Sequence, residues 1–358
     1  PPPAGTACLG TSCAYVPAAL LEAAGKLPWR LRAPRERAGG TDLADVYMGR
    51  VTCSYTRCLL EAAEDGCFAG LDGMVFTTGC DAMRRLHDNL AYLQPGSFLH
   101  MLDLPHKTTA EAIGYYRDEL RTLADRLRAA FGVDLEDDAL RAAIRDQDRV
   151  REQLASIDAL RTRAEPPLTG ADMISICTGA ASLPAGEAAG LLAGLQRELD
   201  AAPELAPATT PARARVVMAI SQLDHPGYLE AVESSGALVV GEVGCTAASA
   251  YGGPAVEHED PYLALAARSL GRLPCPRMME SFERLHAALG EMVRAREAHG
   301  VIIACMKFCD PWGIQGALLA RALREDGIPV LRLEREYFLS GEGQIATRVQ
   351  AFMESMGR

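Results

Sequence analysis

Short apolar runs alternate with longer amphipathic stretches along most of this chain, and this alternation restricts the fold more than any other feature. Six runs have the length and the β-branched content of buried strands, and apolar residues recur at helical spacing between several of them. Continuous apolar strands joined by helical crossovers are typical of parallel sheets that are covered on both faces. The six predicted strands are residues 73–78, 97–104, 214–220, 237–243, 301–306 and 329–334.

The chain is long enough for two such domains, with 358 residues of which 49% are hydrophobic. A helix is predicted over residues 108–132, where Thr108 and Glu111 can form a capping box and Gly132 ends the helix. A second helical region covers residues 135–164 and stops before Pro166-Pro167. Because a proline pair cannot continue a helix, this dipeptide marks the predicted boundary between domains 1–167 and 168–358, with a weaker break at 201–212. The predicted fold class is α/β, with two doubly wound parallel-sheet domains that face a cleft and a helical segment between them.

Composition excludes several kinds of protein. The chain carries 36 basic and 47 acidic residues, a net charge of −11, which argues against a non-specific nucleic-acid binder. No apolar run reaches the length of a membrane span, and the first residues, PPPAGTACLG, lack the basic flank and apolar centre of a signal peptide. We therefore expect a cytoplasmic protein. Eleven cysteines in such a chain favour reduced thiols, either buried or bound to metal, over a disulfide framework.

Several of these cysteines stand where predicted strands end. Cys80 follows the strand at 73–78, Cys245 follows 237–243, Cys309 follows 301–306, and Cys53 follows a shorter extended candidate at 46–52. Ligands of open α/β sheets bind at the carboxyl ends of the strands, so these thiols are expected to gather at one site. Two loop cysteines are expected to reach the same cleft: Cys67 in EDGCFAG and Cys275 in LPCPR.

Other interpretations of the cysteines stay open. A cysteine inside an apolar run is more often a packing residue, which is the interpretation for Cys305 and for Cys177. Zinc fits poorly because no paired C-x2-C knuckle is present. Separated single thiolates suit an iron–sulfur cluster assembled from distant loops. The alternative is a cysteine nucleophile, which needs a base, and the candidates are His87, His100 and His106.

Four stretches of the chain together carry a specific combination of motifs. They are residues 5–31, which begin GTACLGTSC; residues 53–90, which contain CSYTRC and TTGCD; residues 303–337, which contain KFCDPW and a strand after GIP; and residues 343–356, GQIATRVQAFMESM. In this order they resemble the 2-hydroxyacyl-CoA dehydratase and benzoyl-CoA reductase superfamily, of the type of 2-hydroxyglutaryl-CoA dehydratase component D. The resemblance runs through nearly the whole chain. It implies two α/β domains around an oxygen-sensitive iron–sulfur cluster, and low-potential one-electron chemistry: either dehydration through a ketyl radical or reduction of an aromatic ring.

The resemblance also implies which thiols hold the cluster. A [4Fe-4S] site with three thiolates falls on Cys53, Cys80 and Cys309, with one iron open for water or substrate. The double-cubane branch of the superfamily, whose [8Fe-9S] cluster uses six cysteines, is resembled at three further positions, and Cys67 is the one that discriminates between the two forms. Both forms stay open. The further positions are Cys67, Cys245 and Cys275, and Cys13 aligns with an early cysteine near the cluster.

Partners and substrate follow from the same resemblance. It implies an ATP-hydrolysing activator that carries its own [4Fe-4S] cluster, and either a homodimer or a heterodimer with a homologous subunit. The usual substrates are CoA thioesters. The turn after Cys245, CTAASAYGG, lacks the glycine followed by a basic residue that is frequent there, and the strand at 214–220 runs into SQLDHPG instead of a glycine-rich turn. Glycines and a basic side chain would admit and pair an anionic ligand such as the phosphates of CoA. Because this chain lacks them at these turns, the expected substrate is either a CoA thioester or another small molecule.

Candidate proton donors lie near the expected cleft, and the residues do not single one out: they are His106, Glu242, Tyr15, Asp81 and Asp310. Two functions of other classes also stay open. One is a non-catalytic or electron-relay subunit that pairs with a homologous catalytic chain. The other is a metal-free, cysteine-based redox enzyme.

Overall fold

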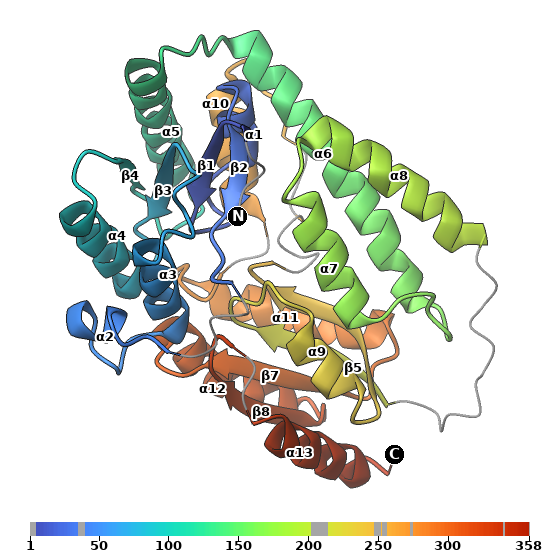
Figure 1. Ribbon diagram of the computed structural model, residues 1–358. Helices are drawn as coiled ribbons and strands as arrows, with labels where there is room; N and C mark the ends of the chain where they lie inside the picture. Colours follow the sequence, from blue (N-terminus) through green and yellow to red (C-terminus); the bar gives the residue numbers. More distant parts are fainter. Residues whose placement is uncertain are drawn as a thin grey trace.

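Two four-stranded sheets, both entirely parallel, form the framework of the computed structural model (Figure 1). The structure describes residues 5–34, 40–201, 214–246, 252, 256–272, 275–338 and 341–357. The first sheet has the order β2-β1-β3-β4 and the second has the order β6-β5-β7-β8. The same 2-1-3-4 order therefore occurs twice. The expected α/β class with two parallel sheets flanked by helices is confirmed.

The first sheet is built early in the chain. Its strands are β1 (Cys8–Thr11), β2 (Leu27–Arg30), β3 (Gly73–Thr77) and β4 (Phe98–Leu102). One face packs against α3 (Ser54–Glu64) and α4 (Asp81–Leu93), and the other against α1 (Ala18–Ala23), α5 (Ala110–Phe131) and α10 (Pro261–Gly271). Helix α10 comes from the second half of the chain, yet it lies against α5.

The second sheet consists of β5 (Ala214–Ile220), β6 (Ala237–Gly244), β7 (Gly300–Met306) and β8 (Val330–Arg335). Along β5 the side chains alternate between two cores: Val216 and Met218 face one, Val217 and Ala219 the other. A strand buried on both sides has this pattern, which explains the unbroken apolar runs. Helices α11 (Ser281–Ala295) and α12 (Asp310–Glu325) cover one face, and α7 (Gly170–Ala180), α9 (Gly227–Glu233) and α13 (Glu342–Ser355) cover the other.

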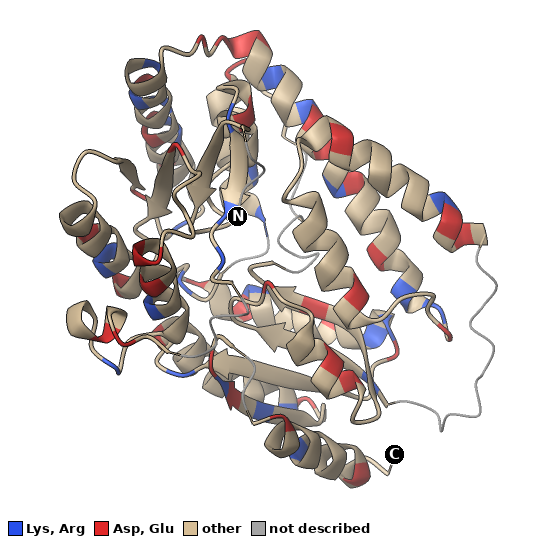
Figure 2. Cartoon of the chain, viewed as in Figure 1, with Lys and Arg blue, Asp and Glu red and all other residues tan. Residues whose placement is uncertain are grey.

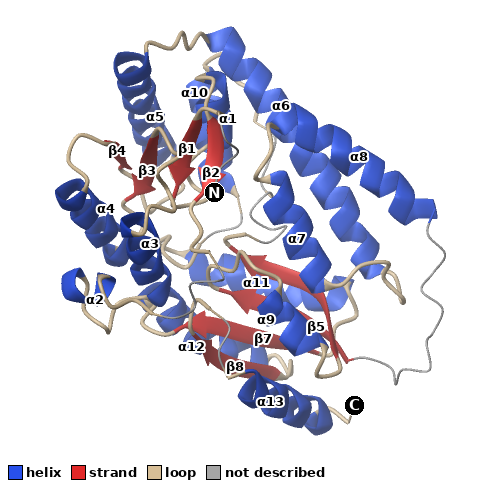
Figure 3. Ribbon diagram, viewed as in Figure 1, coloured by secondary structure: helices blue, strands red, loops and turns tan. Residues whose placement is uncertain are grey.

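A helical layer lies beside both sheets (Figure 3). It is formed by α6 (Asp137–Ala159), the short 3-10 helix η2 (Leu160–Thr162), α7 and α8 (Ala185–Ala201), and α6 and α8 pack against each other. Charged residues of both signs follow α6 and α8, whereas the strands are mostly uncharged (Figure 2). The helices of the described residues include none that is both long and apolar enough to cross a bilayer. The boundary at Pro166-Pro167 stays a prediction; it separates α6 from α7 and α8, which belong to the same layer.

The structure confirms all six predicted strands and both long helices, and it corrects three details. Residues 46–52 form no strand: they contain the end of α2 (Ala44–Tyr47) and a turn. The N-cap of α5 is Thr109, whose hydroxyl accepts from the N–H of Ala112, and not Thr108; Gly132 ends the helix in the left-handed conformation, as expected. Strands β1 and β2 were missed because each has only four residues. β2 also contains Pro28, which an edge strand tolerates.

Candidate functional site

A cavity of about 440 Å³ lies where the carboxyl ends of the two sheets meet. Cys13 follows β1 and Cys80 follows β3, the two strands between which the order of the first sheet reverses. Gln222 follows β5 and Cys309 follows β7, which hold the same position in the second sheet. Open α/β sheets bind ligands at this switch point. Here two switch points share one cavity.

Three of the cavity-lining thiols begin three different helices. Cys53, Cys80 and Cys309 are the N-cap residues of α3, α4 and α12. The unpaired N–H groups and the positive end of the helix dipole favour negative charge at this position. A thiolate, or an anionic group bound to thiolates, is therefore stabilised by three helix ends at once.

Burial raises the pKa of two of these thiols, Cys53 and Cys309. It raises the pKa of Cys309 to about 12, with a further contribution from Cys53, and it raises the pKa of Cys53, with a further contribution from Cys80. The N–H groups of Tyr55 and Trp312 partly offset this effect. The three thiols thus act on one another electrostatically. A metal that replaces their protons removes the cost of burying thiolates without a partner.

A second group of thiols lies across the same cavity. Cys13 and Cys245 line it, and Cys275 directly precedes the lining residues Pro276 and Arg277. Nη1 of Arg277 lies 3.4 Å from Sγ of Cys275. A hydrogen bond with Cys275 is the main reason that the pKa of Cys245 falls to about 7. Burial opposes the positive charge of the Arg277 guanidinium, but four nearby thiols raise its pKa above the ordinary value: Cys275, Cys80, Cys13 and Cys245.

Cys67, like Cys275, is not among the residues that line the cavity. It lies three residues beyond the end of α3, whose first turn carries Cys53. The N–H of Cys67 donates to the carbonyl oxygen of Ala62, so the chain turns back at the end of α3; the nine steps from Cys53 to Ala62 rise about 14 Å at 1.5 Å per residue. Cys305 is buried in β7, where its thiol contacts the carbonyl oxygen of Trp312, and Cys177 is buried in α7. Both are packed as expected.

The proton-donor candidates have different surroundings. Among His106, Glu242 and Tyr15, only His106 lines the cavity; burial lowers its pKa, and its Nε2 has no partner within the described residues. Glu242 instead forms an ion pair with Arg161. The buried hydroxyl of Tyr15 accepts from the N–H of Cys275, and burial raises its pKa to about 12, which makes it a weak acid. Asp81 and Asp310 line the cavity beside their capping cysteines.

Whether these residues can hold metal depends on whether the metal is a single ion or a larger cluster. No three His, Cys, Asp or Glu side chains in the described ranges stand close enough to hold a single metal ion. A [4Fe-4S] cluster has a different requirement, because each thiolate binds a different iron and the sulfurs stand farther apart. Three separated thiols at the edge of one cavity fit such a cluster better than they fit a single ion.

Sequence reasoning missed two arginines of this cavity. Arg277 has a buried Nε without a partner among the described residues, and its side chain lies against Gly79. Arg30, at the end of β2, donates from Nη2 to the side-chain oxygen of Gln222. The position of Arg277 two residues after Cys275 was the available signal.

Comparison with known proteins agrees with this architecture. Residues 13–356 match the family model for 2-hydroxyglutaryl-CoA dehydratase, D-component. YjiM of Escherichia coli, which carries the name of a dehydratase subunit, is 26% identical over 98% of this chain and 92% of its own length. One subunit of the benzoyl-CoA reductase of Thauera aromatica is 26% identical over 88% of this chain and 82% of its own. The beta subunit of (R)-2-hydroxyglutaryl-CoA dehydratase of Acidaminococcus fermentans is 23% identical over 98% and 93%. The chain therefore belongs to the 2-hydroxyglutaryl-CoA dehydratase D-component family.

Proposed function

We propose that this chain is a subunit of an iron–sulfur enzyme that carries out low-potential, one-electron reduction or radical dehydration. The cluster is a [4Fe-4S] cluster held by Cys53, Cys80 and Cys309. The observation that carries this proposal is the meeting of these three thiols, each at the start of its own helix, at one cavity. The family to which the chain belongs, named for a CoA-thioester dehydratase, supports the type of reaction.

The described residues favour one cubane over two. A six-thiol site requires Cys67, and Cys67 lies beyond the far end of α3 from Cys53. Cys245 and Cys275 remain close to the cavity, where their hydrogen bond satisfies them without metal. The double-cubane [8Fe-9S] form is therefore the alternative that the experiment below must separate.

When bound, the cluster supplies single electrons at a low potential, because thiolate ligands and burial disfavour added negative charge. The chain supplies the surroundings. Three helix N-termini and Arg277 place positive charge around the site, which limits how far the potential falls. His106 offers an imidazole in the cavity that can take up and pass on a proton. Such electrons require a strong donor, for which we propose an ATP-hydrolysing activator with its own [4Fe-4S] cluster.

A partner subunit is part of the proposal. The benzoyl-CoA reductase and 2-hydroxyglutaryl-CoA dehydratase relatives are each named as one subunit of an enzyme. The electron-relay role is therefore the second candidate, in which this chain passes electrons to a homologous catalytic chain. Substrates of either form are CoA thioesters or other small molecules. The relay role predicts that the isolated chain binds its cluster but turns over no substrate.

The test is an iron and sulfide count after anaerobic purification. We expect about four irons per chain, against about eight for the double cubane. Each of Cys53→Ser, Cys80→Ser and Cys309→Ser should abolish stable iron binding. Cys67→Ser is the matched control, a half-buried thiol in the segment that follows α3, and should leave the count unchanged. If Cys67→Ser lowers the count, the double-cubane form is correct, and iron-free wild-type protein that shows thiol-dependent redox activity would establish the metal-free enzyme instead.

A further inference from the structure

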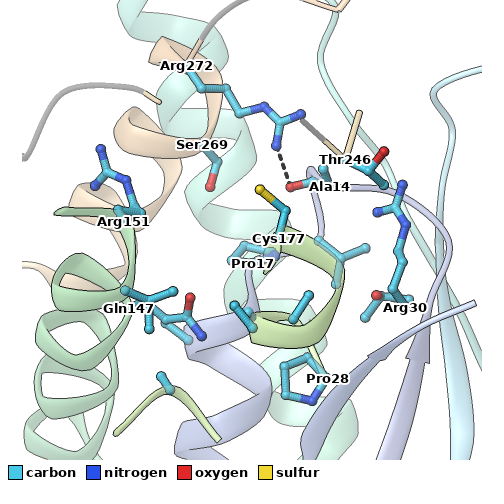
Figure 4. Close-up of a pocket in the computed structure, with 18 of the residues that line it drawn as sticks. Ala14, Pro17, Pro28, Arg30, Gln147, Arg151, Cys177, Thr246, Ser269 and Arg272 are labelled. Atoms are coloured by element: carbon cyan, nitrogen blue, oxygen red, sulfur yellow. Dashed lines mark hydrogen bonds between the residues drawn. The ribbon is translucent and has the colours of Figure 1, made fainter. Parts of the chain in front are cut away.

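A second, smaller cavity of about 190 Å³ adjoins the thiol cavity. Among the described residues, Cys13, Arg30 and Cys245 line both, so these side chains lie between the two spaces. The remaining walls come from α1, α6, α7 and α10. Figure 4 shows Arg272 and Arg151 on one side of this cavity and Pro17, Pro28 and Cys177 among the side chains that surround it.

Positive charge dominates the polar part of the lining. Four arginines contribute to it: Arg30, Arg151, Arg268 and Arg272. Among the described lining residues the single acid is Asp224, whose carboxylate already accepts from the hydroxyl of Tyr337 at 2.8 Å. The charges in this cavity are therefore far from balanced.

Two of these arginines hold donor atoms without a partner. Nη1 of Arg268 and Nε of Arg272 are buried and make no hydrogen bond to any described residue. Arg272 is 8% exposed; its other contacts are the carbonyl oxygen of Ala14, 2.7 Å from Nη1, and the ring of Tyr15. Neither contact carries a negative charge. An unsatisfied buried donor on a cation is costly, so an anion that reaches it gains strongly.

The acid nearest to Arg268 does not neutralise the group. Oδ1 of Asp148 lies 2.8 Å from Nη2 of Arg268 and 2.6 Å from Nη1 of Arg151, so one carboxylate serves two guanidinium groups. Arg268 and Arg272 are four residues apart at the end of α10, a spacing that places them on the same side of the helix. Burial, followed by the charge of Arg151, lowers the pKa of Arg268 to about 10, which reflects the missing counter-charge.

Much of the remaining lining is apolar and the space is small. Val16, Pro17, Val150, Leu183 and Leu265 contribute hydrocarbon surface. The volume of about 190 Å³ lies below the roughly 300–1,000 Å³ of pockets that take drug-sized molecules. A coenzyme is too large for this space. A short or aromatic acid has the matching combination of one anionic end and an apolar body.

We propose that this cavity binds a small organic monocarboxylate, with its carboxylate on Arg268 and Arg272 and its apolar part against Pro17, Val150 and Leu265. Binding itself needs no cluster. The assignment of this acid as the substrate rests on the proposed function, because the cavity ends at the wall that it shares with the thiols.

The test is isothermal titration calorimetry on the full chain, purified anaerobically, with iron counted in the same sample. Benzoate is the probe, and benzamide is its neutral match. We expect saturable binding of benzoate, at least tenfold weaker binding of benzamide, and a loss of at least tenfold in Arg268→Gln. Arg121→Gln is the control, because Arg121 pairs with Asp260 at the start of α10 but does not line the cavity, and it should bind benzoate as the wild type does.

A second variant keeps the test decisive if Arg268→Gln does not fold. Ser269 lines the cavity (Figure 4), and Ser269→Leu should fill it without a change of charge and abolish benzoate binding. Three results would each overturn the proposal. They are equal affinity for benzoate and benzamide, inorganic phosphate that binds as tightly as benzoate does, and no benzoate binding up to about 10 mM. Benzoate binding to iron-free protein would support this site and overturn the proposed function, whereas normal iron without benzoate binding would do the reverse.

Discussion

Arg161 and Glu242 form a fully buried ion pair, with Nη2 of the arginine 2.6 Å from Oε2 of the glutamate. It joins the end of the helical layer to β6 of the second sheet, and Asp158 binds the same guanidinium. This geometry explains why Glu242 does not reach the cavity, although its position near the end of a strand suggested a proton donor.

Loss of either partner should destabilise the fold and leave iron binding intact. Because a buried charge is left unpaired, Glu242→Gln or Arg161→Met should lower the free energy of unfolding by about 3–5 kcal/mol. Asp200→Asn removes an exposed partner of Arg163 and should change it by less than about 1 kcal/mol. Urea unfolding measures both effects. A Glu242→Gln protein of normal stability that has lost activity would restore Glu242 as a functional acid.

Because β3 and β4 approach each other closely at Gly73, a larger residue there should destabilise the fold. A Cβ atom at Gly73 would lie 2.4 Å from the carbonyl oxygen of Phe98, which the strand ladder holds in place. We expect Gly73→Ala to cost about 1–3 kcal/mol of unfolding free energy. The same substitution at Gly114, within α5 and without a heavy atom within 4 Å, should stabilise by about 0.5–1 kcal/mol. Equal effects of the two variants in thermal and urea unfolding would contradict this account.

A buried histidine should make stability depend on mildly acidic pH. His100 lies in β4 with Nε2 unpartnered within the described residues, and burial, with a smaller effect of Arg126, lowers its pKa from 6.5 to about 4. Between these values the unfolded chain binds a proton that the folded chain excludes, so the free energy of unfolding falls as the pH decreases. The loss should total about 3 kcal/mol by pH 4.

Substitution separates this contribution from the general acid response. His100→Leu should flatten the dependence of unfolding free energy on pH between about 6.5 and 4. His258→Gln, which removes an exposed histidine, should keep the slope of the wild type. A slope that survives in His100→Leu would assign the acid sensitivity to other groups.

Cys245 should react with alkylating agents near neutral pH in the iron-free protein. Its pKa of about 7 depends mainly on the hydrogen bond with Cys275, so the rate of alkylation by iodoacetamide should rise through about pH 7. In Cys275→Ala the midpoint should move above pH 8. Cys305, whose pKa burial raises to about 11, is an internal control that should stay unmodified. Peptide mass spectrometry reports both sites, and an unchanged midpoint in Cys275→Ala would refute the pairing.

The sequence predicted those parts of the site that depend on local pattern. Cys80 and Cys309 follow long apolar strands, and the carboxyl edge of a parallel sheet is where such residues meet. Cys53 was expected at this edge because residues 46–52 were predicted to form a strand. No strand forms there, and Cys53 lies at the cavity because it begins α3. The only sequence signal for Arg277 was its position two residues after Cys275. The docking of α10 onto α5 was not predictable, because it depends on contacts between residues far apart in the chain, which no periodicity records.

The three thiols that begin α3, α4 and α12 share no turn, and their helices are held by apolar side chains such as Leu59, Leu86 and Leu319. Small zinc domains, in contrast, fold only around their metal. We therefore expect this chain to fold without the proposed cluster and to stay folded when that cluster is lost. Iron and sulfide could then be inserted again into the existing fold, without synthesis of a new chain.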